Sequence, residues 1–211
     1  MNGSAHIVCG SPQLWLPRVK QLAGYLIGVD QGALKLIKKG IALDVAIGDF
    51  DSVSALERQR IEEKAKLVLE LPAAKDMTDC EAAVAHAVAL GYREIYIYGA
   101  TGGRFDHQFA TIGLMLKYTK QGIKIRSVDR KNEISILGPG EHLIPARNKR
   151  YVSFFALEAM VTSLTLENVK YPLKGYDLAV EDSLCVSNEP LAAMFGVTFD
   201  SGYLLMIKSS D

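Results

Sequence analysis

Acidic side chains recur directly after four successive apolar runs in the first half of the chain. The runs cover residues 25–29, 45–47, 67–71 and 94–98, and the acidic residues that follow them are, in order, Asp30, Asp49 with Asp51, Asp76 with Asp79, and Asp106. In a doubly wound sheet, ligands bind beyond the carboxyl ends of the strands. If the runs are parallel strands, we expect these carboxylates to face one crevice.

Such a cluster is costly unless something offsets its charge, because neighbouring carboxylates raise one another's pKa. A hard divalent cation relieves the repulsion, and Mg²⁺ prefers a few carboxylates together with substrate phosphates and water. Lys75 and Arg104 lie among the acids in the sequence, and both suit a polyphosphate bridged to that metal. Gly102 and Gly103 would let backbone amides approach a phosphate at a helix start near Phe105. The sequence therefore predicts a metal–phosphate site.

Each of these residues also has an ordinary structural interpretation. An Asp after a strand is often a helix cap or part of a turn, and Thr78 with Glu81 has the spacing of a capping box. Arg104 alone could be a solvated side chain. Independent caps, however, need not place acids at four consecutive strand ends together with two basic residues. This coincidence favours the site.

The same half of the chain alternates the apolar runs with helical segments. Ser54 and Glu57 have capping-box spacing and predict a helix start. A helix after the fourth run is predicted to turn one apolar stripe against a sheet, made of Phe105, Phe109, Ile112 and Leu116. Strands that alternate with helices indicate βαβ units and a mostly parallel, doubly wound sheet.

After about residue 122 the pattern changes to short apolar runs without long helices. These predicted strands cover residues 123–128, 133–137, 151–157, 163–166, 184–187, 197–199 and 203–208. Gly and Pro clusters between them indicate turns. We expect an α/β domain over residues 1–125 and an antiparallel β-sandwich or barrel over residues 126–211.

Composition narrows the functional classes. The chain has 211 residues, with 24 Lys and Arg against 24 Asp and Glu, and this balance argues against a nucleic-acid or anionic-membrane binder. Apolar runs are too short for a membrane span, and the first residues do not have the pattern of a secretory signal. Three separated cysteines fit a reducing compartment. We expect a soluble, cytoplasmic protein.

Four motifs together resemble the thiamine pyrophosphokinase (thiamine diphosphokinase) family, in that family's order and spacing. They are Asp30-Gln31-Gly32-Ala33, Gly48-Asp49-Phe50-Asp51-Ser52, Lys75-Asp76-Met77-Thr78-Asp79 and Gly102-Gly103-Arg104-Phe105-Asp106-His107. Later in the chain, Tyr171-Pro172-Leu173 and Ser187-Asn188-Glu189 are similar to that family's substrate-binding end. The resemblance covers nearly the whole chain.

The resemblance implies an α/β nucleotide-binding domain followed by a β-sandwich, assembled as a homodimer with shared active sites. It implies transfer of a pyrophosphoryl group from ATP to the hydroxyl of thiamine, giving thiamine diphosphate and AMP with Mg²⁺. The implied metal and catalytic carboxylates are Asp49, Asp51, Asp76 and Asp79, with Arg104 also catalytic. The implied ATP contacts are Asp30, Lys75, Thr78, Arg104, Asp106, His107 and Gln108, and the implied thiamine contacts are Ser187 and Asn188. Asp51 or Asp76 is the expected proton acceptor.

The sequence departs from the family at two points. Gln31 stands where many members have Gly, and the single Trp15 lies in the first half, whereas some relatives carry a late Trp near thiamine. Phe195, Phe199 and Tyr203 are candidates for that aromatic role, although sandwich-core positions explain them better.

Two other functions fit parts of the pattern. Asp49, Asp51 and Val53 match the motif of haloacid-dehalogenase-like phosphatases, which would make Asp49 a nucleophile and Asp51 a general acid. That motif normally follows the first strand of its domain, and the segment around Arg104 would then have no role. A non-catalytic nucleotide sensor could use the same pocket, although a surplus of carboxylates weakens anion binding unless a metal is present.

Overall fold

The computed structural model describes residues 3–72, 74, 76–147 and 149–211. The chain divides into two compact units, Met1–Arg130 and Lys131–Asp211, and each is described by itself. The division follows β6 (Lys124–Val128), whereas the boundary expected after residue 125 falls inside this strand.

The first unit is built on a parallel sheet whose strands lie in the order β4-β3-β2-β1-β5-β6. The strands are β1 (Ala5–Val8), β2 (Tyr25–Val29), β3 (Leu43–Gly48), β4 (Ala65–Glu70), β5 (Glu94–Tyr98) and β6. From β1 the chain proceeds outward to β4 and then returns to β5 on the other side of β1. The predicted doubly wound fold is confirmed, and β1, which the sequence analysis missed, occupies its centre.

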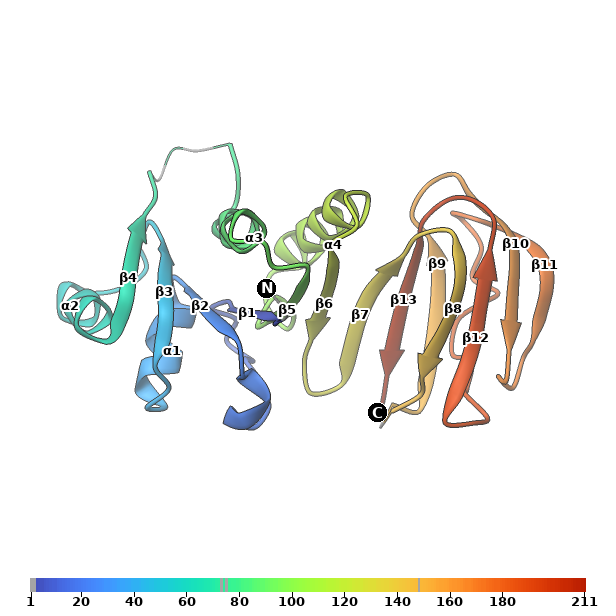
Figure 1. Ribbon diagram of the computed structural model, residues 1–211, viewed down its shortest axis with the longest axis horizontal. Coiled ribbons are helices and arrows are strands. Elements are labelled where there is room, and N and C mark those ends of the chain that lie inside the picture. Colours follow the sequence, from blue (N-terminus) through green and yellow to red (C-terminus); the bar gives the residue numbers. More distant parts are fainter. Residues whose placement is uncertain (1–2, 73, 75, 148) are drawn as a thin grey trace. The chain divides into compact units, whose positions relative to one another are not determined.

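Helices cover both faces of this sheet (Figure 1). They are α1 (Gln31–Lys38), α2 (Ala55–Lys64), α3 (Asp79–Ala89) and α4 (Phe105–Thr119), with a short 3₁₀ helix over Val19–Leu22. α1 contacts α2 on one face, and α3 contacts α4 on the other. The predicted capping box of α2 is present, since Ser54 Oγ accepts the Glu57 N–H and Glu57 accepts the Ser54 N–H.

The predicted apolar stripe of α4 is wrong in its first half, whereas Ile112 and Leu116 in its second half are partly buried. Phe105 and Phe109 are 76% and 68% exposed. The buried side of the helix instead carries Thr111, Leu114, Met115 and Tyr118. At about 100° per residue, the centre of this buried face lies roughly 140° around the helix from the centre of the predicted stripe.

The second unit consists of two antiparallel sheets around one apolar core. The first sheet contains, in spatial order, β7 (Asn132–Leu137), β13 (Leu204–Ser209) and β9 (Tyr151–Ala156). The second sheet contains, in spatial order, β11 (Leu173–Ala179), β10 (Met160–Glu167), β12 (Met194–Phe199) and β8 (Gly140–Pro145). Phe195 and Phe199 are buried in the core beside Phe154. The predicted β-sandwich is confirmed, and these two phenylalanines are core residues.

Two strands of the sandwich were missed and one was predicted wrongly. β8 and β11 are the edges of the second sheet, and edge strands tolerate the Gly, Pro and charged residues that hid them in the sequence. Residues 184–187 form turns and not a strand, with Leu184 and Val186 exposed. Throughout the described part of the chain, no helix is long and apolar enough to cross a membrane.

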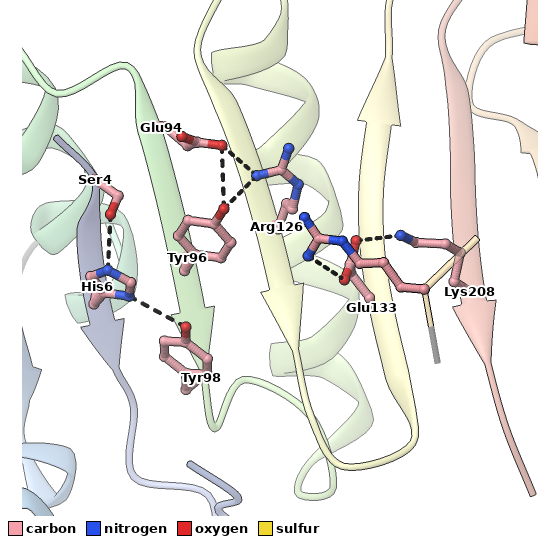
Figure 2. A network of polar contacts seen from close by, with 9 residues as sticks. Ser4, His6, Glu94, Tyr96, Tyr98, Arg126, Glu133 and Lys208 are labelled. Carbon is pink, nitrogen blue, oxygen red and sulfur yellow. Dashed lines mark hydrogen bonds and ion pairs between the residues drawn. The ribbon is translucent and has the colours of Figure 1, made fainter. Parts of the chain in front are cut away.

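Each unit buries a polar cluster (Figure 2). In the first unit, His6 of β1 lies 2.9 Å from Ser4 Oγ and 3.3 Å from the Tyr98 hydroxyl, and burial lowers its pKa. In the second unit, Lys208 of β13 is only 2% exposed and its Nζ lies 2.7 Å from Glu133 Oε1 of β7. The residues Lys208 and Glu133 are direct register partners, so the ion pair ties these strands together.

We expect Lys208→Met to destabilise the protein by about 2–3 kcal/mol, because it leaves the Glu133 carboxylate, whose side chain is 12% exposed, with only the longer ion pair to Arg147 (3.7 Å). Urea unfolding measures the change, and Lys174→Met, at an exposed lysine of β11, is the matched control. A Lys208→Met protein as stable as the control would show that the ion pair contributes nothing beyond what an apolar side chain of similar size provides.

Candidate active site

A cavity of about 520 Å³ opens beyond the carboxyl ends of β1, β2 and β5. It lies where the strand order reverses around β1, the place where doubly wound sheets bind ligands. Its size is typical of small-molecule sites. The residues that line it are Cys9, Gly10, Ser11, Pro12, Val29, Asp30, Gln31, Ser52, Thr78, Asp79, Cys80, Gly99, Ala100, Gly103, Arg104, His107, Ala110 and Thr111.

The loop Cys9–Pro12 after β1 forms part of this lining and was missed by the sequence analysis. It runs beside the loop after β5, since the Ser11 N–H donates to Gly99 O (3.3 Å) and Ser11 Oγ donates to Thr101 O (2.7 Å). β1 has only four residues, too few for a clear period. A short apolar run that ends in Gly-Ser-Pro is the one signal that could have indicated the loop.

Asp30 connects the ends of β2 and β3. Its N–H donates to Ile47 O (3.1 Å), and its Oδ1 accepts the Phe50 N–H (3.3 Å). A Cβ atom added at Gly48 would lie 1.7 Å from the same Oδ1, so only glycine fits there. Asp49 Oδ1 in turn accepts the Asp51 N–H (3.1 Å). The carboxylate of Asp30 thus holds the loop that carries Asp49 and Asp51.

Thr78, Asp79 and Cys80 enter the cavity from the start of α3. Thr78 Oγ1 accepts the Glu81 N–H (3.2 Å) and caps the helix. Asp79 is the first helical residue, and its Oδ1 is buried. A hydrogen bond with the Cys80 thiol, followed by burial, raises the pKa of Cys9 well above its usual value.

The start of α4 supplies Arg104 and His107 to the same cavity. Arg104 forms a bidentate ion pair with Asp106, in which Nε donates to Oδ1 (3.1 Å) and Nη2 donates to Oδ2 (2.5 Å). This hydrogen bonding lowers the pKa of Asp106. Gln108 donates from Nε2 to Gly103 O (3.1 Å) and so supports the glycine turn. Asp106 orients the guanidinium, and Gln108 orients the backbone beside it.

The structure therefore brings together five of the predicted site residues around one cavity: Asp30, Thr78, Asp79, Arg104 and His107. Asp49, Asp51, Asp76, Asp106 and Gln108 do not line the cavity, although their loops or helix starts contribute other residues to it. Lys75 lies outside the described residues. Among the residues that are described, no three His, Cys, Asp or Glu side chains gather closely enough to hold a metal ion.

Ser187 and Asn188 belong to the second unit. Asn188 is 3% exposed. Its Oδ1 accepts the N–H groups of Tyr171 (3.0 Å) and Glu189 (2.9 Å), and its Nδ2 donates to Tyr171 O (2.8 Å). The amide therefore holds two chain segments together. Ser187, with a φ of 60°, and Tyr171 remain exposed beside it.

Comparison with known proteins matches both units to one family. The family described as "Thiamin pyrophosphokinase, catalytic domain" matches residues 16–127, and "Thiamin pyrophosphokinase, vitamin B1 binding domain" matches residues 141–204. The chain is 39% identical to the thiamine pyrophosphokinase of Bacillus subtilis over 98% of both chains.

Solved structures agree with this match. The crystal structure of the Bacillus subtilis protein has a TM-score of 0.91 over 99% of both chains. That of a thiamin pyrophosphokinase family protein from Enterococcus faecalis is 33% identical, with a TM-score of 0.90 over 99% of both chains. With both units matched and a relative this similar over its full length, the chain belongs to the thiamine pyrophosphokinase family.

Proposed function

We propose that the cavity of the first unit is the site where this chain carries out the family's reaction. A pyrophosphoryl group passes from ATP to the hydroxyl of thiamine, giving thiamine diphosphate and AMP. The observation that carries the assignment is the cavity at the strand-order reversal, lined by residues from all four of the family-like motifs. ATP occupies this cavity.

The phosphates of ATP lie against the start of α4 in this proposal. Gly103 and Arg104 line the cavity there, and a helix N-terminus favours anions. Arg104 binds phosphate oxygens through the edge of the guanidinium that Asp106 leaves available, since a guanidinium has five donors. His107 and Thr78 contact the nucleotide, Gln108 supports the turn, and Lys75 adds a second cation.

Mg²⁺ fits the donor chemistry of Asp49, Asp51, Asp76 and Asp79, because this ion takes hard oxygen ligands. Such a site would use one or two of these carboxylates and be completed by phosphate oxygens and water. When bound, Mg²⁺ would neutralise charge on the phosphate oxygens.

The protein's own residues then position the reactants and stabilise charge, which is most of what phosphoryl transfer requires. Asp30 fixes the loop that carries Asp49 and Asp51. Arg104 and Lys75 stabilise the charge that develops on the departing AMP. Asp51 or Asp76 accepts the proton of the thiamine hydroxyl.

Thiamine binds at the second unit in this proposal, near Ser187. Asn188 acts there by holding Tyr171 in place beside Ser187, so in this proposal Asn188 has a positioning role in place of the expected direct contact. The β-sandwich is small and would gain from packing against another copy. We therefore propose a cytoplasmic homodimer in which one chain supplies the nucleotide cavity and the other the thiamine-binding residues.

The two alternative functions have less support. A haloacid-dehalogenase-like phosphatase would use Asp49 as its nucleophile, but this residue follows β3, the third strand along the chain, whereas the phosphatase motif normally follows the first strand of its domain. A nucleotide sensor would bind ATP without turnover.

Incubation with ATP, Mg²⁺ and thiamine distinguishes the proposed function from both alternatives, because only the proposed reaction forms AMP in a thiamine-dependent way. ADP or phosphate without AMP would overturn the proposal.

We expect Asp51→Asn and Asp76→Asn each to lower kcat by about 100-fold or more, because each removes negative charge where transition-state electrostatics dominate. AMP formation measures the loss, and circular dichroism checks the fold. Glu63→Gln, at an exposed carboxylate of α2, is the matched control. Wild-type turnover in either Asp variant would remove that residue from the mechanism.

Gly48→Ala should also lower activity by about 100-fold, since its Cβ would displace Asp30 Oδ1 and with it the acidic loop. Gly113→Ala on α4 meets no atom within 4 Å and should leave AMP formation unchanged. If Gly48→Ala keeps full activity at a normal Mg²⁺ requirement, the loop does not depend on this close contact.

Mixing inactive variants tests the shared site. Chains that carry Asp51→Asn and chains that carry Asn188→Ala, re-mixed in equal amounts after mild dissociation, should regain about a quarter of the wild-type sites, because half of the dimers are mixed and each of these has one intact composite site. A monomer by sedimentation, or a dimer in which mixing restores nothing, would contradict a site shared between subunits.

A further inference from the structure

Lys35 of α1 lies beneath the cavity-lining loop Cys9–Pro12. Its Nζ donates to the carbonyl oxygens of two consecutive residues, Gly10 (2.8 Å) and Ser11 (2.5 Å). Gly10 and Ser11 line the cavity, whereas Lys35 does not. The two carbonyl groups are therefore directed toward α1, behind the loop.

These contacts fix the orientation of two peptide groups. A lysine ammonium has three donors and no acceptor, and two of the three are used here. Ser11 O also accepts the Leu14 N–H (3.1 Å), while Ser11 Oγ donates to Thr101 O. The loop is thus held on one flank by α1 through Lys35 and on the other flank by the segment after β5.

Lys35 differs from the other lysine of its helix in its hydrogen-bond partners. Lys38, one turn further on, forms an ordinary exposed ion pair with Glu57 (3.0 Å). No ion pair joins Lys35 to a carboxylate within the described residues, and partial burial lowers its pKa. The side chain accepts a desolvation cost without an acidic partner, and its hydrogen bonds to the loop are what offset that cost.

Carbonyl oxygens carry partial negative charge and would repel a polyphosphate if they faced it. We propose that Lys35 is a positioning residue of the nucleotide site, which keeps the carbonyl groups of Gly10 and Ser11 turned away from the cavity so that ATP meets the opposite side of the loop. This inference rests on the proposed function, because it takes the cavity as the ATP site.

Three variants test the role. Lys35→Met removes both donors and keeps most of the side-chain volume, Lys35→Arg keeps a cation that can reach two carbonyls, and Lys38→Met is the control on the same helix. Displacement of a binding group by about 1 Å can cost about 100-fold. We expect Lys35→Met to raise the KM for ATP about tenfold or more, with kcat and the KM for thiamine changed less than about threefold.

Lys35→Arg should recover most of the affinity for ATP, and Lys38→Met should behave as wild type. Isothermal titration calorimetry gives a Kd for ATP·Mg²⁺ without thiamine. That Kd should rise in parallel with the KM. If Lys35→Met does not fold, Lys35→Gln takes its place in the same measurements.

A fall in kcat at unchanged KM and Kd, in proportion to lost folded protein, would show that Lys35 is only structural and would overturn the inference. Equal values for Lys35→Met and Lys38→Met would do the same. Failure of the proposed function looks different: the wild type then forms no thiamine-dependent AMP. In that case the calorimetric titration still decides whether Lys35 controls nucleotide binding, and a wild type that binds no ATP overturns both.

Discussion

The hydrogen bond from the Phe50 N–H to Asp30 Oδ1 (3.3 Å) is the contact on which the acidic edge of the sheet depends. Asp30 has a φ of 46° where it makes this hydrogen bond, and its carboxylate occupies the place that a Cβ on Gly48 would take. Two neighbouring strand ends are joined in this way through backbone and one carboxylate. The loop with Asp49 and Asp51 is then held by the protein itself, before any cation is present to offset its charge.

A second glycine without a Cβ allows a close contact where α1 meets β1. A Cβ on Gly32 would lie 1.9 Å from Val8 O, so the helix starts in direct contact with the central strand. This close approach brings Lys35, one turn later, within reach of Gly10 and Ser11. A helix held further from the sheet could not support the loop after β1, and the floor of the cavity would then lack its connection to α1.

The features that could be predicted from the sequence are those that depend on a local residue pattern or on the order of the strands. The acids after β2, β3, β4 and β5 lie at the carboxyl ends of parallel strands, as expected, and the capping residue Ser54 starts α2. The sequence did not predict β1, whose four residues show no period, or the buried face of α4, where Phe105 and Phe109 are apolar but exposed. The contact of Lys35 with Gly10 joins residues 25 positions apart, and such contacts produce no periodic pattern in the sequence.

Several motif residues in this chain hold other groups in place. Asp106 holds the Arg104 guanidinium, Gln108 holds Gly103 O, and the buried amide of Asn188 holds Tyr171 on both its N–H and its carbonyl. A motif therefore does not separate the residues that touch a substrate from those that position them. For phosphoryl transfer this division is physically reasonable, because the protein forms no covalent bond to the group it moves and contributes mainly fixed geometry and fixed charge. A small displacement of a supporting side chain then displaces the backbone and, through it, the groups that contact the reacting atoms. The supporting residues are therefore as important for the reaction as the residues that they hold.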